Sequence, residues 1–148
     1  MFKKEILENQ RKIFDLKLIK RDLDFDEILS VLKLDKIISL IWSRRAWKTF
    51  LTFQIAKELI NKKIIDLEDI VYLDFSWILN KDLDLNIIEN SFLELFPDKT
   101  PFFIFDEIQE LNNFSEKLIN LLNIWYKILI TWSNAHLLSK EISTILRW

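Results

Sequence analysis

The stretch from Lys36 to Phe50 constrains the fold of this chain more than any other. It begins with an apolar run, Lys36 to Ile41, passes through a short polar loop, and continues into a helix predicted from about Lys48 to Asn61. A continuous apolar run is typical of a strand that is buried on both faces, as in a parallel sheet covered by helices. The stretch therefore predicts a strand, a loop and a helix of an α/β protein.

The loop of this unit has the layout of a phosphate-binding loop (P-loop), whose pattern is G-x-x-x-x-G-K-[ST]. Lys48 and Thr49 stand at the last two positions, while Trp42 and Trp47 stand at both glycine positions. In such a loop, backbone N–H groups surround the phosphates and the lysine neutralises them. We therefore expect ATP to bind at the following residues: Trp42, Ser43, Arg44, Arg45, Ala46, Trp47, Lys48, Thr49 and Phe50.

Glycine is absent from the whole chain of 148 residues, which contains six tryptophans. At the ordinary frequency near 7%, a chain of this length would contain about ten glycines. Five of the six tryptophans stand at positions where the backbone conformation would favour glycine: Trp42 and Trp47 in the loop, Trp125 and Trp132 around a predicted strand, and Trp148 at the end. The position of Trp77 is uninformative.

Our hypothesis is that these tryptophans stand for glycine in the living protein. Lys, Ile, Asn, Phe and Leu dominate the composition, which fits a very AT-rich gene. Some bacterial genetic codes read UGA as glycine and others read it as tryptophan, so translation with the wrong table would produce this pattern. The alternatives are a deliberate replacement of glycine by tryptophan, or a degenerate gene.

The composition limits the class of protein. A chain of 148 residues with 50% hydrophobic residues suits one domain with a packed core. The net charge of -2 and the pI near 5.5 give no general attraction to nucleic acid or membrane. There is no cysteine, the first residues do not form a signal peptide, and no apolar run reaches the roughly 18 residues of a membrane span. We expect a cytoplasmic protein.

Strands and helices are predicted to alternate along the chain. Residues 1–34 form an N-terminal helical segment that packs on the core, and residues 35–148 form the core. Four alternations argue for a three-layer α/β domain with a parallel sheet. The predicted helices are 3–14, 24–33, 48–61, 84–96, 114–123 and 135–146, and the predicted strands are 36–41, 70–75, 101–107 and 127–131.

Polar side chains are predicted to meet at one edge of this sheet. The loop Trp42 to Thr49, the pair Asp106 and Glu107, and the stretch Thr131 to Asn134 all follow predicted strands. In a parallel α/β sheet, ligands bind at the carboxyl ends of the strands. The Thr49 hydroxyl would ligate Mg²⁺, Asp106 would hold the same ion, and Glu107 is a candidate base for the attacking water.

A short polar side chain after the last strand would orient that water. We slightly prefer Asn134 to Ser133, and Thr131 is a third candidate. Taken singly, each of these signals is common, because Lys-Thr pairs and strand-end acids also occur as ordinary helix starts and caps. Their order and spacing together favour a nucleotide site.

Other charged residues have less specific interpretations. Arg147 is read as a surface arginine, with an arginine finger in a neighbouring subunit as the alternative. The single histidine, His136, is read as a surface helix residue, because one histidine without cysteine makes no convincing zinc site. Four basic residues near the N-terminus are read as a solvated face, with a partner surface as the alternative: Arg11, Lys12, Lys20 and Arg21.

Three motifs together resemble a known family. Ile41 to Thr49, Phe103 to Gln109, and Leu129 to Leu138 followed by Glu141-Ile142 resemble the prokaryotic AAA-type ATPases in which an N-terminal P-loop domain precedes a C-terminal domain of unknown function. Glycine at positions 42, 47, 132 and 148 would complete each family pattern. The resemblance implies ATP and Mg²⁺ as ligands, Lys48 and Thr49 as nucleotide-binding residues, Asp106 and Glu107 as the Walker B acids, and Asn134 or Ser133 as the sensor.

The resemblance also implies that the chain is a fragment, because relatives continue beyond Trp148. The related fold has the strand order 5-1-4-3-2, and only four strands are visible here. The P-loop strand would then lie at an open edge of the sheet, which invites aggregation. We therefore expect residues 1–148 alone to be poorly soluble.

The leading functional prediction is an ATP-binding and Mg²⁺-dependent ATP-hydrolysing module whose downstream process is unknown. Written with tryptophan at 42 and 47, the chain is expected to be inactive, so its standing as an enzyme depends on those two positions. The alternative is a non-catalytic or degenerate P-loop fragment that acts as a protein-interaction module. A homo-oligomer or an unknown protein is a possible partner, and DNA binding has weak support because no recognition motif stands out.

Overall fold

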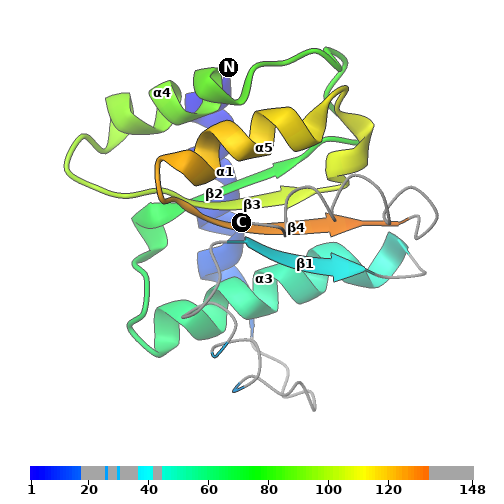
Figure 1. The fold of residues 1–148 in the computed structure, drawn as a ribbon. Helices are drawn as coiled ribbons and strands as arrows, with labels where there is room; N and C mark the ends of the chain where they lie inside the picture. Colours follow the sequence, from blue (N-terminus) through cyan, green and yellow to red (C-terminus); the bar gives the residue numbers. More distant parts are fainter. Residues whose placement is uncertain (18–25, 27–29, 31–36, 42–44, 134–148) are drawn as a thin grey trace.

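The computed structural model describes residues 1–17, 26, 30, 37–41 and 45–133, with the backbone alone for 37–41 and 45–48 (Figure 1). The helices are α1 (Phe2–Asp15), α3 (Arg45–Asn61), α4 (Leu85–Leu95) and α5 (Phe114–Asn123), with short 3₁₀ turns η1 (Leu67–Asp69) and η2 (Ile108–Glu110). The strands are β1 (Ile37–Ile41), β2 (Ile70–Asp74), β3 (Phe102–Asp106) and β4 (Lys127–Trp132).

The four strands form one parallel sheet in the order β1-β4-β3-β2. Helices α4 and α5 cover one face and α3 covers the other (Figure 1). Successive strand residues point to opposite faces, so Phe103 and Phe105 join the core under α4 and α5, while Phe102 and Ile104 join the core under α3. The predicted three-layer α/β class with a parallel sheet is confirmed.

The predicted strands and helices in the described part of the chain agree with the observed ones to within one residue, with one exception. The helix after β1 begins at Arg45 rather than at about Lys48. Arginine, alanine and tryptophan all tolerate a helix, and no glycine interrupts them. Only residues 42–44 therefore separate β1 from α3. The predicted helix 135–146 and the predicted boundary at residue 34 lie outside the described residues, and of the predicted helix 24–33 only residues 26 and 30, both helical, are described.

Helix α1 lies along the outer edge of β2 and contacts both cores. Ile6 belongs to the core under α4 and α5, and Ile13 belongs to the core under α3. The Asn9 side chain donates to the carbonyl of Tyr72 (3.0 Å), and the Gln10 side chain donates to the carbonyl of Ile70 (3.0 Å). Because an edge strand presents unpaired carbonyls, these two amides satisfy the groups that a further strand would use.

We expect the double substitution Asn9→Ala and Gln10→Ala to lower the free energy of unfolding by about 3 kcal/mol, at about 1 kcal/mol for each of three lost hydrogen bonds, since Gln10 also donates to the carbonyl of Glu68 at 3.1 Å. It should also increase self-association, because the carbonyls of β2 become available to a neighbouring chain. Urea denaturation and light scattering would measure the two effects. Glu8→Ala with Lys12→Ala, two exposed residues of the same helix, is the matched control. Equal stability of the two double variants would contradict the edge role of the amides.

The P-loop strand β1 forms the other edge of the sheet, as the strand order in the related fold predicts. Its one partner within the described residues is β4, which pairs Ile37 with Ile128 and Ile41 with Trp132. The two edges of the sheet therefore differ: a helix covers β2, and nothing in the described part of the chain pairs with the outer side of β1. The expected poor solubility stays a prediction.

Candidate functional site

The Asp106 carboxylate, at the end of β3, is the centre of the site. It is buried, with 2% of the residue exposed, and three hydroxyl groups donate hydrogen bonds to it. Thr49 from α3 donates at 2.8 Å and Tyr72 from β2 donates at 2.9 Å to Oδ2, and Thr131 from β4 donates to Oδ1. A buried carboxylate needs such partners, and these donors fix its orientation.

Tyr72 is a member of this site that the sequence interpretation did not include. Burial raises the pKa of its phenol above the ordinary value, and the neighbouring Asp106 carboxylate raises the pKa further. The phenol therefore stays protonated and remains a donor to Asp106. The sequence feature that could have indicated its role is a tyrosine among the aliphatic residues of a buried strand, because a buried tyrosine hydroxyl usually has a hydrogen-bond partner.

Glu107, the next residue, leaves the direction of the strand. Its backbone has φ 53° and ψ 45°, a left-handed conformation that is costly for a residue other than glycine. The turn brings its carboxylate to the end of β4, where Oε2 accepts hydrogen bonds from Ser133 Oγ (2.8 Å) and from the Gln109 side chain. Thr131 also accepts from the Glu107 backbone N–H at 3.3 Å. The ends of β3 and β4 are thus joined by side chains.

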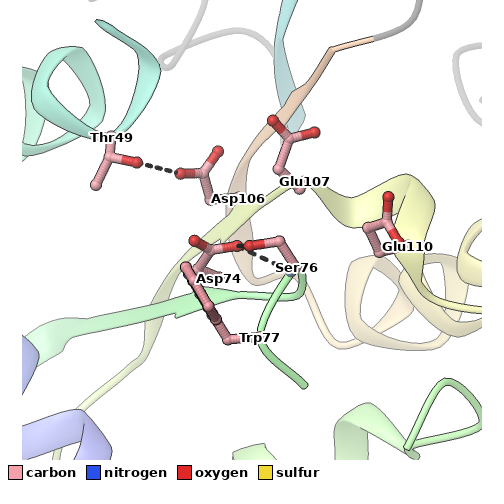
Figure 2. Close-up of a pocket in the computed structure, with 7 residues that line it drawn as sticks. All are labelled: Thr49, Asp74, Ser76, Trp77, Asp106, Glu107 and Glu110. Carbon is pink, nitrogen blue, oxygen red and sulfur yellow. Dashed lines mark hydrogen bonds between the residues drawn. The ribbon is translucent and has the colours of Figure 1, made fainter. Parts of the chain in front are cut away.

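A pocket of about 220 Å³ opens beside these acids (Figure 2). The residues that line it include four carboxylates and two hydroxyls, and no lysine or arginine of the described residues lines it. Glu110 forms an ion pair with Lys81 (3.7 Å), and the three other carboxylates of the described lining favour a cation. The lining residues are Thr49, Asp74, Ser76, Trp77, Asp106, Glu107 and Glu110.

The donors in this pocket suit a hard cation such as Mg²⁺. No group of three or more His, Asp or Glu side chains in the described residues could by itself hold a metal ion. Mg²⁺ does not require such a cage, because it is commonly bound by one or two protein oxygens, several waters and the phosphates of a substrate. The hydroxyl of Thr49 and the carboxylate of Asp106 lie in direct contact and could supply those protein oxygens.

Of the predicted site residues, the structure brings together Thr49, Asp106, Glu107, Thr131 and Ser133. Residues 42–44 and Asn134 lie outside the described residues, as do His136 and Arg147. The backbone of residues 45–48 forms the first turn of α3, and Phe50 lies in α3 but is not among the residues that line the pocket. The sequence interpretation missed Tyr72, Asp74, Ser76, Gln109 and Glu110, which lie at or beside the pocket.

The sequence model of a family described as an AAA domain matches residues 34–147. The chain therefore belongs to this family of P-loop ATPase domains, which are nucleotide-binding modules. It is also similar to the uncharacterized protein MJ1544 of Methanocaldococcus jannaschii, with 35% identity over 150 residues. That alignment covers 99% of this chain and 31% of the relative, so the chain spans about a third of the length of the relative.

No solved structure matches the chain. Within the residues that the structure describes, no helix is long and apolar enough to cross a membrane.

Proposed function

We propose that this module hydrolyses ATP in a Mg²⁺-dependent reaction. The observation that carries the proposal is the hydrogen bond between Thr49 and Asp106, which are 57 residues apart in the sequence. They belong to the helix after the P-loop strand and to the Walker B strand, and they meet beside a strained acid, Glu107.

The hydroxyl of Thr49 is prepared for a cation by its own hydrogen bond. The hydroxyl donates its hydrogen to Asp106 Oδ2, with 2.8 Å between the two oxygens, so the lone pairs of the Thr49 oxygen remain for a metal ion. Tyr72 and Thr131 hold the Asp106 carboxylate in place without contributing charge. Bound Mg²⁺ would neutralise the β- and γ-phosphates and orient them for attack.

The remaining steps are assigned to the chain's own residues. Lys48 would neutralise the phosphates from the first turn of α3, where backbone N–H groups also face the anion. Glu107 would accept the proton of the attacking water. Ser133 contacts the base directly, and Asn134 is the other candidate for orienting the water.

Substitution of the proposed metal ligand Asp106 tests this proposal directly. In the chain carrying glycine at the recorded tryptophan positions, we expect Asp106→Asn to weaken the Mg²⁺-dependent part of ATP binding by about 10- to 100-fold, the usual effect of disturbing a metal site. Titration calorimetry with and without a chelator would measure it. Asp98→Asn, an exposed acid after α4, is the matched control. An unchanged response of Asp106→Asn to Mg²⁺ would contradict the proposal.

A second proposal concerns the tryptophans, which we propose are glycines in the native protein. Three tryptophan side chains are described: two lie at the surface, and Trp132 packs edge-to-face on Phe114 in the core, with ring centroids 5.9 Å apart. Trp77 and Trp125 are 83% and 75% exposed, and Trp132 is buried with an indole N–H that has no partner in the described part of the chain. Trp125 also has φ 72°, a conformation that favours glycine. The codons at these positions, or the masses of native tryptic peptides, would decide between the two residues.

Trp125 offers a test of this second proposal in the folded state. Trp125→Gly should raise the free energy of unfolding by about 1 kcal/mol, because a residue other than glycine pays about 1–2 kcal/mol in the left-handed region. Trp77→Gly is the control, since Trp77 is also largely exposed but does not have a positive φ. Chemical denaturation would measure both variants. A greater gain for Trp77→Gly than for Trp125→Gly would contradict the argument.

The alternative of a degenerate, non-catalytic fragment is favoured by one observation. With tryptophan at position 47, helix α3 begins at Arg45 and shortens the loop to residues 42–44. A loop of this length has few backbone N–H groups with which to surround phosphates. The chain with tryptophan at positions 42 and 47 therefore fits the non-catalytic alternative, and the chain with glycine at these positions fits the ATPase.

A further inference from the structure

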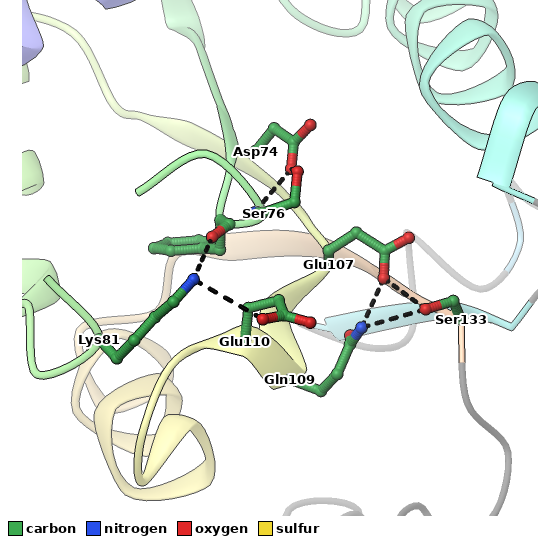
Figure 3. A network of polar contacts seen from close by, with 8 residues as sticks. Asp74, Ser76, Lys81, Glu107, Gln109, Glu110 and Ser133 are labelled. Carbon is green, nitrogen blue, oxygen red and sulfur yellow. Dashed lines mark hydrogen bonds and ion pairs between the residues drawn. The ribbon is translucent and has the colours of Figure 1, made fainter. Parts of the chain in front are cut away.

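The side chain of Gln109 lies between the Glu107 carboxylate and the hydroxyl of Ser133 (Figure 3). Its amide nitrogen donates to Glu107 Oε2, and Ser133 Oγ lies 3.3 Å from the same nitrogen. Ser133 itself donates to Glu107 Oε2 at 2.8 Å. Two donors from different elements, η2 and the end of β4, therefore hold one oxygen of the same carboxylate.

The Gln109 amide donates to this carboxylate, and in this orientation the amide oxygen has no hydrogen-bond donor in the described part of the chain. Gln109 Oε1 is buried and has no hydrogen-bond partner in the described part of the chain. The reverse orientation of the amide would place Oε1 against the negative Glu107, so the orphaned oxygen is the consequence of donating to the base. An unsatisfied buried acceptor costs free energy and calls for an explanation in a native structure.

A second strained feature converges on the same carboxylate. Glu107 has the left-handed backbone conformation described above, and strain of this kind gathers at functional sites where the surroundings hold it. The surroundings here are rigid, because Ile108 and Leu111 on either side of Gln109 are buried in the core. The N–H of Asn112 also bonds to the carbonyl of Lys81 at 2.8 Å. Gln109 is therefore held by a fixed turn rather than by a loose loop.

We propose that Gln109 is a positioning residue for the hydrolysis reaction: together with Ser133 it fixes the carboxylate of Glu107 in the orientation needed to take a proton from the attacking water. This inference rests on the proposed ATPase function and adds a residue to which no role was assigned in the sequence. Gln109 does not line the pocket, so it acts through Glu107 rather than on the nucleotide.

The test uses the full-length protein with glycine at the recorded tryptophan positions. We expect Gln109→Ala and Gln109→Glu to lower kcat for ATP by about 10- to 100-fold, the effect of a small misplacement of a reacting group. The Kd for ATP should not change. Gln109→Glu keeps the size of the side chain but replaces the donor by a second carboxylate. Asn120→Asp, which makes the same chemical change on the exposed face of α5, should leave kcat and Kd unchanged.

A double-substitution cycle separates positioning from a structural role. In a Glu107→Gln chain, whose residual rate is measured in single turnovers with enzyme in excess, Gln109→Ala should cause no further loss, because no base is left to orient. Two results would overturn the role of Gln109 without affecting the ATPase proposal. One is a further loss of rate on adding Gln109→Ala to the Glu107→Gln chain, and the other is a parental kcat for Gln109→Ala in the chain that retains Glu107. An unaltered chain that binds ATP without hydrolysing it would overturn the ATPase proposal, and with it this role.

Discussion

Replacing Glu107 by Gln should leave the Kd for ATP unchanged and slow hydrolysis by about 100- to 10,000-fold, the range that a positioned general base contributes. The substitution keeps the shape of the side chain but removes its ability to accept a proton. Its amide oxygen can still accept from Ser133, which reaches Glu107 Oε2 at 2.8 Å. The local structure should therefore survive, and the loss should fall on the chemical step.

Phosphate release under saturating ATP, together with a separate binding measurement, would distinguish these two quantities. Glu116→Gln is the matched control, because Glu116 is an exposed acid on α5. If Glu107→Gln hydrolysed ATP at the rate of the parent, another residue would have to activate the water. Ser133 and Asn134 would not suffice as replacements, because neither can hold a proton as a carboxylate does.

Placing glycine at positions 42, 47 and 132 should tighten ATP binding by roughly 30- to 1000-fold. Each of the two loop positions pays about 1–2 kcal/mol where a P-loop requires a glycine conformation, and about 1.4 kcal/mol corresponds to a tenfold change in affinity. Any contact of an indole with the ligand adds to this difference. Helix α3 begins at Arg45, which leaves only residues 42–44 between β1 and α3.

Titration calorimetry with Mg²⁺ and ATP would compare the two forms. Trp125→Gly alone is the control, because Trp125 lies beyond α5 and is absent from the pocket lining. It should change stability without changing affinity. Equal affinities of the tryptophan and glycine forms would refute the argument that these positions need small residues.

The sheet could be predicted because buried parallel strands are nearly all apolar. The run Phe102–Asp106 can be recognised as a strand from its own residues, without knowledge of the strands that pair with it. Its last residue, Asp106, then lies at the carboxyl edge of the sheet. The meeting of Asp106, Glu107 and Ser133 followed from topology alone, since the ends of adjacent parallel strands share one edge. Those parts of the site depended on strand order and not on side-chain detail.

The rest depended on contacts that periodicity does not encode. Tyr72 reaches Asp106 across 34 residues of sequence because β2 and β3 pair in one particular register. Gln109 faces Glu107 because Glu107 adopts a left-handed turn that nothing in its own residue type requires. Asn9 and Gln10 are polar residues of an amphipathic helix, yet both are buried, because their partners are the carbonyls of an edge strand.

Among the residues that the structure describes, the two edges of the sheet differ in their openness to a further strand. Helix α1 occupies the carbonyls of β2, so an additional strand, whether from the same polypeptide or from another molecule, would pair with β1. β1 leads directly into the loop expected to surround the phosphates, so such a strand would become a neighbour of the nucleotide. Its docking and the state of the nucleotide would then influence each other through one shared strand.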